Sequence, residues 1–477
     1  MNQLQLFLPC AAGVEDYLAP EVLRITGLPP GCITKQRGGV AVRTSFAHAM
    51  LLNLYSRLAQ RVLVLLSYTE YRSEQDLYRA ASEVAWERWF TPRESIKVEI
   101  TAQHSPLNSL NFAALKIKDA VCDRFRTVAG GVRPDVNTQW PDVRLYAHLT
   151  TDSCSLYIDT SGEPLFKRGW REDKGDAPLK ETLAAAMIAA SGWLDGEGDL
   201  QPLYDPCCGS GTILIEAAQM ACNLPAGGQR RFAFEKYLPF RKADWDAMKS
   251  EAVDAVSIPD AGQKPIIFGS DVAHRMVDFA QRNAERAGVA QVIEFRGGDA
   301  LQRMPPMDVS QTGGGVMILN PPYGERIEVA GVARAGRMER APQRGKVASS
   351  AYAESGSSYE EDSVIADQGS MQQGRFGARE LPQTDNGGDF FSQLATHWKK
   401  NYAGWTAWML TPDLKLPGKM RLKESRRVPM WNGPIECRLF RFDMVAGSAR
   451  ERGPKPEGQG AAGSAGENGV RSPDAQR

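Results

Sequence analysis

The sequence predicts an α/β protein in which an open, largely parallel sheet follows a smaller α+β half. Beyond residue 200, short apolar runs alternate with helical patterns, which is the order typical of a parallel sheet. The first of these runs ends at Asp205, and a glycine-rich loop and a helical pattern follow it. Before residue 160, alternating strand patterns and helical patterns predict a mixed α+β arrangement.

The composition is that of a soluble globular protein. The chain of 477 residues is 42% hydrophobic and has 57 basic and 57 acidic residues, so nucleic-acid binding must depend on local patches. The N-terminus lacks the features of a signal peptide, and the apolar runs are too short to cross a bilayer. We therefore expect a cytoplasmic protein with no membrane partner. The eight cysteines form no C-x-x-C pair, so no metal site is expected.

The first half is predicted to contain two α+β regions, at 1–67 and 68–160. Strand patterns lie at 4–8, 39–43, 61–67, 95–101, 143–150 and 153–159. Helical patterns lie at 14–23, 47–58, 76–84 and 110–126. A polar linker at 161–176 is expected to separate this half from the parallel sheet.

Basic residues gather on the predicted helix at 110–126 and in the linker. They are Lys116, Lys118, Arg124, Arg126, Lys167 and Arg168. Without other information, such residues indicate a solvated surface. They indicate a phosphate-contacting face only if the following domain acts on nucleic acid.

The second half, 177–445, is predicted to form the parallel sheet. A helix begins near Pro178, as proline tolerates. Strand patterns begin at 203 and lie at 265–268, 292–295, 316–319 and 406–410, with helical patterns at 184–190, 213–222, 273–287 and 389–401. Asn432-Gly433 predicts a hairpin between 428–431 and 435–442. We expect an inserted helical arm within 220–264, a disordered insertion at 328–388 and a disordered tail at 446–477.

The loop at 205–212, with the sequence D-P-C-C-G-S-G-T, lies where open α/β sheets bind ligands. Gly209 and Gly211 let the backbone turn sharply and approach a ligand. The loop has neither phosphate-binding glycine motif, and Asp205 would repel a pyrophosphate. A cationic ligand fits better, and S-adenosylmethionine carries a sulfonium and an ammonium. A purely structural turn is the alternative, and Cys207 and Cys208 are interpreted as small loop residues rather than a redox pair.

Polar residues end four successive strand patterns. They are Asp205, Asp271, Asp299 and Asn320. In a parallel sheet these ends meet at one edge, and an acid after the second strand suits ribose hydroxyls. Each acid could instead cap a helix, which is the main alternative for Asp271. Polar residues at the ends of four successive strands together indicate a ligand-binding site at this edge of the sheet.

The segment Asn320-Pro321-Pro322-Tyr323 is the most specific motif. Two prolines restrict the backbone directly after a strand, which can aim the Asn320 side chain and a proline carbonyl at one point. Both groups are hydrogen-bond acceptors that suit an exocyclic amine. Tyr323 offers a ring for stacking on a base turned out of its helix. The alternative is a rigid turn with a core tyrosine.

With these motifs the chain resembles the bacterial THUMP-domain 23S rRNA (guanine-N2)-methyltransferases. The resemblance covers 1–327 and 388–445, and depends on F-L-P-C-A-A-G-V-E-D-Y-L, A-P-L-K-E-T-L-A, D-P-C-C-G-S-G-T, N-P-P-Y-G-E-R and N-G-P-I-E-C. It implies a ferredoxin-like region, a THUMP RNA-binding module and a class I (Rossmann-like) methyltransferase domain. The expected reaction is methylation of a guanine N2 in 23S rRNA near the peptidyl-transferase region, on free rRNA or a pre-50S particle. Some members carry a second methyltransferase domain, whereas a single activity is expected here.

The resemblance also implies residue roles. Asp205, Gly209 and Gly211 line the methionine side of S-adenosylmethionine, Asp271 binds its ribose, and Asp299 binds its adenine amine. Further cofactor contacts are expected from Cys207, Thr212, Ala300, Pro178 and Thr182. Asn320 and Pro321 hold the guanine amine, Pro322 restricts the loop, and Tyr323 stacks on the base. Two other classes remain open: a DNA adenine-N6 methyltransferase and a non-catalytic rRNA-binding assembly factor.

Overall fold

The computed structural model describes residues 3–175, 178–195, 201–259, 266–321 and 387–445. The tail expected at 446–477 lies outside these residues, as does the expected insertion at 328–388 except for its last two positions. Within the described residues, no helix is both long and apolar enough to cross a membrane.

The N-terminal half is built on one continuous sheet of seven strands. The strands are β1 (Leu4–Pro9), β2 (Ile33–Gln36), β3 (Gly39–Thr44), β4 (Leu63–Glu70), β5 (Ile96–Ala102), β6 (Val143–Leu149) and β7 (Ser153–Asp159). Their order is β2-β3-β1-β4-β7-β6-β5, and only β5 and β6 run parallel. The pairing of β4 with β7 joins the two regions predicted at 1–67 and 68–160, and β4 itself crosses position 67.

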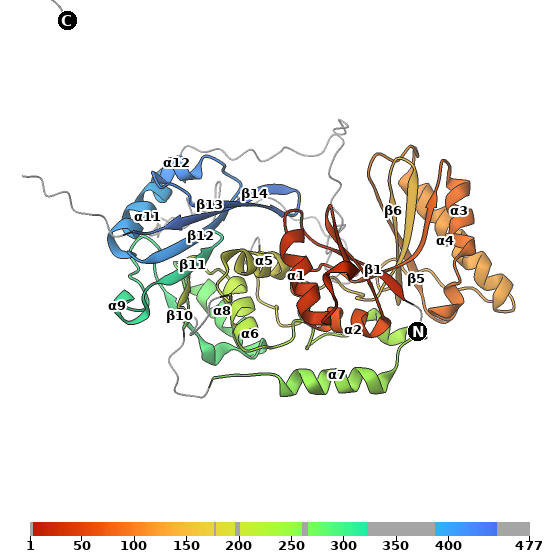
Figure 1. Ribbon diagram of the computed structural model, residues 1–477, viewed down its shortest axis with the longest axis horizontal. Helices are drawn as coiled ribbons and strands as arrows, with labels where there is room; N and C mark the ends of the chain where they lie inside the picture. Colours follow the sequence, from red (N-terminus) through yellow and green to blue (C-terminus); the bar gives the residue numbers. More distant parts are fainter. Residues whose placement is uncertain (1–2, 176–177, 196–200, 260–265, 322–386, 446–477) are drawn as a thin grey trace, which may run out of the picture. The chain divides into compact units, whose positions relative to one another are not determined.

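Four α-helices accompany this sheet. They are α1 (Glu15–Thr26), α2 (Phe46–Tyr55), α3 (Glu74–Glu83) and α4 (Leu110–Val128). Figure 1 shows α3 and α4 side by side, and α4 packs against β5. Gly27 ends α1 in the left-handed conformation with φ of 65°, and Ser73 forms a capping box with Asp76 at the start of α3.

Helix α2 ends at Tyr55, three residues before the predicted end. The buried carboxylate of Glu21, on α1, accepts hydrogen bonds from the Ser56 hydroxyl and from the backbone amides of Arg57 and Leu58. These amides therefore bond to a side chain instead of continuing the helix. The missed strand β2 follows a short helical turn and is mostly exposed, so it has no apolar pattern that would reveal it.

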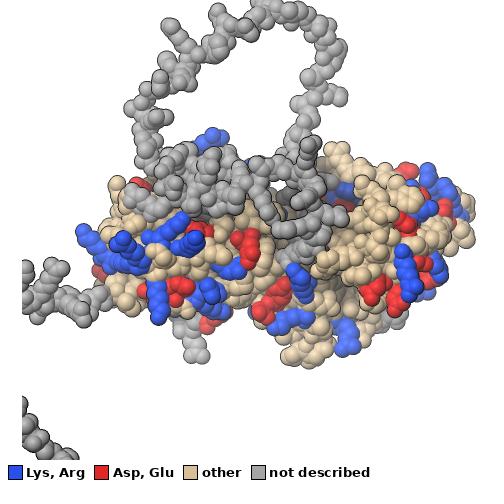
Figure 2. Space-filling model, turned by 90° about the horizontal axis from the view of Figure 1, so that it is seen from above, with Lys and Arg blue, Asp and Glu red and all other residues tan. Residues whose placement is uncertain are grey.

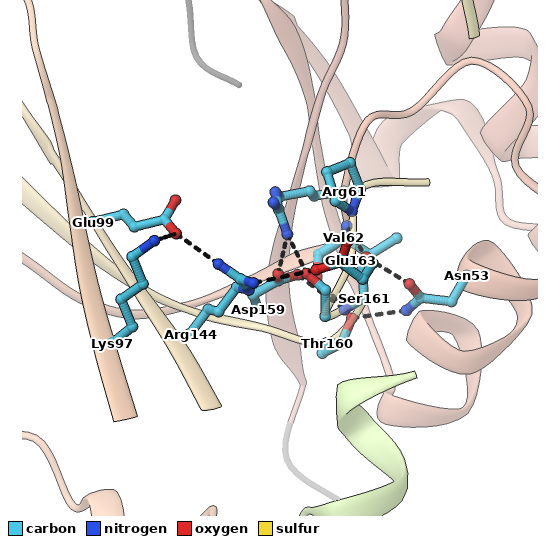
Figure 3. A network of polar contacts seen from close by, with 12 residues as sticks. Asn53, Arg61, Val62, Lys97, Glu99, Arg144, Asp159, Thr160, Ser161 and Glu163 are labelled. Carbon is cyan, nitrogen blue, oxygen red and sulfur yellow. Dashed lines mark hydrogen bonds and ion pairs between the residues drawn. The ribbon is translucent and has the colours of Figure 1, made fainter. Parts of the chain in front are cut away.

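A polar network joins the two regions of the N-terminal half (Figure 3). Arg61 NH1 lies 2.5 Å from Oδ2 of Asp159, and both side chains are almost fully buried. The Asn53 amide donates to the Thr160 hydroxyl at 2.7 Å and accepts from the Ser161 hydroxyl at 2.6 Å. Buried ions are tolerated only when they are paired and hydrogen-bonded. These contacts therefore require the two regions to pack in one defined arrangement.

The C-terminal half is a second seven-stranded sheet. Its strands are β8 (Leu203–Asp205), β9 (Ile267–Asp271), β10 (Ile293–Gly297), β11 (Gly315–Leu319), β12 (Trp405–Thr411), β13 (Arg426–Asn432) and β14 (Ile435–Asp443). The order β10-β9-β8-β11-β12-β14-β13 is parallel from β10 to β12 and antiparallel beyond. The predicted hairpin is confirmed, with Gly433 at φ of 61° in its turn.

Helices connect these strands. They are α5 (Glu181–Ser191), α6 (Thr212–Ala221), α7 (Lys242–Asp254), α8 (His274–Arg286), α9 (Val309–Thr312), α11 (Gly387–Asn401) and α12 (Leu416–Met420). α6 packs against β8 and β9, and α8 packs against β9 and β10, so both lie beside the loop that follows β8. α7 is the helical arm expected between the first two strands, and Figure 1 shows it apart from the sheet.

Candidate active site

Four adjacent parallel strands bring their carboxyl ends to one edge of the second sheet. In spatial order they are β10, β9, β8 and β11, and the residues at or after their ends are Asp299, Asp271, Asp205 and Asn320. The registers place Asp271 opposite Gly297 and Asp205 opposite Gly269. The structure therefore brings together the four polar residues that the sequence singled out.

Backbone amides of the glycine loop bind two of these carboxylates. Cys207 N donates to Oδ1 of Asp205 at 3.0 Å, and Gly209 N donates to Oδ2 of Asp271 at 3.0 Å. The other oxygen of Asp271 accepts from Ala273 N at 2.9 Å. Asp271 thus stabilises the turn before α8 and also fixes the loop after β8, but it does not cap the helix, because the N-cap residue is Ala273.

Burial makes this edge a poor place for an unpaired negative charge. The pKa of Asp205 is raised to about 8, because the carboxyl group is fully buried and because Asp271 lies close. Burial also raises the pKa of Asp271. Among the described residues, Cys207 N is the one hydrogen-bond donor to the Asp205 carboxyl group. A cationic ligand beside these carboxylates would relieve the cost of ionising them.

The two loop glycines have different roles. At Gly209, with φ of 52°, a β-carbon would meet no atom of the described residues within 4 Å, so the backbone beside the two carboxylates is not packed against them. At Gly211, with φ of 86°, a β-carbon would lie 3.0 Å from Cβ of Ala280 on α8. Gly209 therefore leaves room for a ligand, whereas Gly211 allows close packing of α8. This edge fits a ligand with a cationic end, as S-adenosylmethionine has.

The other predicted cofactor residues differ in their surroundings. Thr182, Thr212 and Ala300 are buried, Cys207 is half-buried, and Pro178 is exposed. Asp299 accepts a hydrogen bond from Leu301 N at 2.9 Å, which stabilises the turn after β10. Burial raises the pKa of both loop thiols, Cys207 and Cys208, well above the usual value, so neither is a thiolate at neutral pH.

Of the segment predicted to hold the substrate base, two residues are described. Asn320 is half-buried and Pro321 is buried, directly after β11. Pro322 and Tyr323 lie outside the described residues. Within the described part of the chain, no group of three or more His, Cys, Asp or Glu residues is arranged to hold a metal ion.

The basic residues expected to contact RNA are mostly paired with acids. Arg124 donates to both carboxylate oxygens of Glu87, at 2.8 and 2.6 Å. The remaining pairs are Arg126 with Asp123, Lys118 with Asp119 and Lys167 with Glu163, while Lys116 lies over the ring of Phe112. On the face drawn in Figure 2, basic and acidic side chains are intermingled.

Arg168 does not lie on an RNA-facing surface, so the expectation for this residue is wrong. It is 2% exposed, and its Nε lies 3.0 Å from Oε1 of Glu216 on α6. The other oxygen of Glu216 accepts from Arg57 NH1 at 3.0 Å. Glu216 is fully buried between two guanidinium groups, which hold its pKa below the usual value despite the burial. Arg168 therefore links the first region to the C-terminal half.

Two residues beside the loop were missed in the sequence. Arg171 donates to the hydroxyls of Ser210 and Thr212, and the buried Asn283 donates to the Ser210 carbonyl. Arg171 had no signal that distinguished it from the other charged residues of the polar linker. Asn283 had one, because it is a polar residue on the apolar side of α8, next to the buried Ala280 and Ala284.

Family models match three consecutive parts of the chain. Residues 5–63 match the RlmL ferredoxin-like domain, residues 71–159 the THUMP domain, and residues 168–338 the RMKL-like methyltransferase domain. The strand order and these matches show a class I methyltransferase fold preceded by a THUMP module. The chain thus carries an RlmL ferredoxin-like domain, a THUMP domain and an RMKL-like methyltransferase domain, and it is similar to the ribosomal RNA large subunit methyltransferases K/L.

Curated relatives extend over most of the chain. The "Ribosomal RNA large subunit methyltransferase K/L" of Shewanella loihica is 34% identical over 452 residues, which are 94% of this chain and 54% of that protein. The protein of the same name from Psychromonas ingrahamii is 32% identical, covering 92% of this chain and 50% of its own length. The chain thus spans about half the length of the curated relatives it matches.

Solved structures share the fold. SMU.472, solved in complex with SAH (S-adenosylhomocysteine), has a TM-score of 0.72 at 23% identity. The match covers 93% of this chain and 98% of that protein. A protein of Clostridium difficile 630, described as a possible methylase, has a TM-score of 0.71 at 24% identity. The match covers 96% of this chain and 100% of that protein. Together with the domain match, these structures confirm the expected S-adenosylmethionine-dependent methyltransferase fold.

Proposed function

We propose that this chain transfers a methyl group from S-adenosylmethionine to the exocyclic N2 amine of a guanine in 23S rRNA, near the peptidyl-transferase region. The observation that carries the proposal is the placement of Asn320 and Pro321 after β11, next to β8 and its acidic glycine loop. The THUMP module and the names of the curated relatives support an RNA substrate, either free rRNA or a pre-50S particle.

The roles of the cofactor-side residues follow from their chemistry. When bound, S-adenosylmethionine supplies a methyl group on a sulfonium whose leaving group is a neutral thioether. Asp205, which is buried and has one hydrogen bond among the described residues, pairs with a cationic part of this ligand. Asp271 and Asp299 offer carboxylate oxygens for the ribose hydroxyls and the adenine amine. Gly209 keeps the loop backbone clear of the ligand.

The substrate-side residues orient the nucleophile. The lone pair of the guanine N2 amine is partly delocalised into its ring, so the amine is a weak nucleophile. The side-chain oxygen of Asn320 and the carbonyl of Pro321 accept its hydrogens, which restores the lone pair and fixes the line of attack. We assign stacking on the base to Tyr323. The proton leaves after the transfer, so no strong base is needed.

The test is methyl transfer from labelled S-adenosylmethionine to 23S rRNA, with duplex DNA as a parallel substrate. Mass spectrometry of the digested RNA should find N2-methylguanosine, and rRNA from a deletion strain should lack that nucleoside at one position. N6-methyladenine in the DNA would assign the chain to the adenine class instead. Cofactor binding without transfer to either substrate would indicate a non-catalytic assembly factor.

A further inference from the structure

The side chain of Arg171 contacts the glycine loop at two hydroxyl residues, Ser210 and Thr212. Its NH1 donates to the Ser210 hydroxyl at 3.0 Å, and its NH2 donates to the Thr212 hydroxyl at 2.8 Å. Both hydroxyl residues are buried, and the Arg171 side chain is 13% exposed. The contacts flank Gly211, so one guanidinium group holds both sides of the turn into α6.

The guanidinium group of Arg171 is itself held in place. Its Nε lies 2.7 Å from Oε1 of Glu181, the first residue of α5, and its NH2 also donates to the Leu179 carbonyl at 3.2 Å. Glu181 is 4% exposed, so this pair is shielded from solvent. All three nitrogens of Arg171 are therefore used. Only the planar fork of arginine can reach these acceptors together, because a lysine presents one ammonium.

A second anchor comes from α8. The amide nitrogen of Asn283 donates to the Ser210 carbonyl at 3.1 Å and to the Asp173 carbonyl at 2.8 Å. Asn283 is fully buried. Its side-chain oxygen accepts from the backbone amides of Glu172 and Asp173 at 3.4 and 3.3 Å. The chain segment that carries Arg171 is thus fixed to the same loop residue, Ser210, that Arg171 binds.

We propose that Arg171 is a positioning residue for the cofactor: it holds the loop at 207–212 so that the amides of Cys207 and Gly209 meet Asp205 and Asp271. In this proposal Arg171 acts through the Ser210 and Thr212 hydroxyls and not by direct contact with the cofactor. Its loss should therefore weaken cofactor binding more than it changes the chemical step. This inference rests on the proposed cofactor and is independent of which nucleic acid is methylated.

The test compares Arg171→Lys with Arg282→Lys. Arg282 pairs with Asp173 of the same segment and is half exposed, and the hydrogen bonds described for it go to Asp173 and not to the loop; Asp173 keeps Arg286 as a second partner. Three measurements apply: SAH affinity by calorimetry, hydrogen exchange at the Gly209 and Gly211 amides in ligand-free protein, and the split between KM for the cofactor and kcat. Melting curves report whether each variant folds.

For Arg171→Lys we expect SAH affinity to fall about tenfold or more, since two hydrogen bonds from a charged donor are disturbed. Exchange at the loop amides should accelerate, KM for the cofactor should rise, and kcat should stay close to that of the wild type. Adding Ser210→Ala to Arg171→Lys should cost less than the sum of the two changes. Arg282→Lys should match the wild type in all three measurements.

Unchanged SAH affinity and loop exchange in a folded Arg171→Lys protein would overturn the positioning role. An equal loss of SAH affinity in Arg171→Lys and Arg282→Lys would also overturn it. That result would mean that any change to the contacts of the segment at 171–173 weakens binding. If the wild-type protein binds SAH but does not methylate rRNA, the proposed substrate fails and the binding comparison still decides the role of Arg171. If the wild-type protein binds no SAH, both proposals fail together.

Discussion

The backbone amide of Gly209 donates a hydrogen bond of 3.0 Å to Oδ2 of Asp271, which joins the loop after β8 directly to the end of β9. The same carboxylate accepts from Ala273 N before α8. One acidic side chain thus shapes two loops at the edge where the ligand is expected. A change at Asp271 should therefore affect ligand binding through the geometry of both loops as well as through direct contact.

Replacing Asp271 by alanine should weaken SAH binding by about 1.5–3 kcal/mol, the typical value of a hydrogen bond to a charged group. Calorimetric titration of SAH measures the loss. Asp308→Ala is the matched control, because Asp308 also accepts a backbone amide two residues on but is exposed near α9. If a folded Asp271→Ala protein binds SAH with wild-type affinity, Asp271 does not contribute to ligand binding, and its role is only to stabilise the turn before α8.

The raised pKa of Asp205 predicts that cofactor binding depends on pH. Its folded pKa of about 8 means that most of the carboxyl group is protonated at neutral pH, so binding a cation must expel a proton. SAH affinity should therefore rise by up to about tenfold per pH unit between about pH 6 and about pH 7.5, below the range in which the ligand's own amine titrates. Asp205→Asn should bind more weakly and lose this slope, and an equal slope in both proteins would contradict the assignment.

The raised pKa of Asp205 also affects the stability of the ligand-free protein, which should fall with rising pH, whereas SAH affinity should rise. Asp205 binds a proton more tightly in the folded chain than in the unfolded chain, whose carboxyl groups titrate near pH 3.9. Its contribution to the free energy of unfolding is thus fully present below that pH and is lost as the pH rises to about 8. Urea unfolding of wild-type and Asp205→Asn proteins across this range should show a decline that the variant lacks. Parallel curves would show that the carboxyl group titrates normally.

Arg168→Ala should destabilise the fold rather than weaken RNA binding alone. Removing Arg168 leaves the buried carboxylate of Glu216 with one guanidinium partner, Arg57, and breaking a buried pair costs about 3–5 kcal/mol. Chemical unfolding measures this cost. Lys167→Ala is the control, since the exposed pair of Lys167 with Glu163 is worth about 0–1 kcal/mol. An Arg168→Ala protein as stable as the Lys167→Ala control would contradict the structural role that we assign to the buried pair.

Asn320→Ala should reduce methyl transfer by about 10²–10³ while leaving SAH affinity nearly unchanged. The estimate assumes that one preorganised polar group acts on the reacting atoms, as in oxyanion holes. Single-turnover assays at saturating cofactor and RNA measure the chemical step. Asn401→Ala removes a comparable amide from α11, where it bonds within its own helix. Wild-type turnover by Asn320→Ala would mean that other groups hold the amine.

All strands except β2, and the polar edge, could be predicted because local patterns determine them. Asp205, Asp271, Asp299 and Asn320 each follow a short apolar run, and the parallel order of the sheet brings those ends together without further information. The hairpin at Asn432-Gly433 could be predicted for the same reason, since the turn residues specify it locally.

Pairings between distant residues could not be predicted in this way. Nothing near Arg168 indicates that Glu216, 48 positions away, lies beside it in the core. Basic residues in a linker look alike in sequence, whether they are exposed as Lys167 is or enclosed as Arg168 and Arg171 are. The early end of α2 likewise depends on the carboxylate of Glu21, which reaches its amides only after α1 has packed.

The strand β4 has a practical consequence for anyone dividing this chain into fragments. It lies across the gap between the ferredoxin-like match, which ends at residue 63, and the THUMP match, which begins at residue 71. A cut between the two matches would sever β4 and leave β1 and β7 with unpaired backbone groups, which are templates for aggregation. A truncated protein should therefore keep residues 1–160 intact, because the ferredoxin-like and THUMP modules are hydrogen-bonded into one sheet.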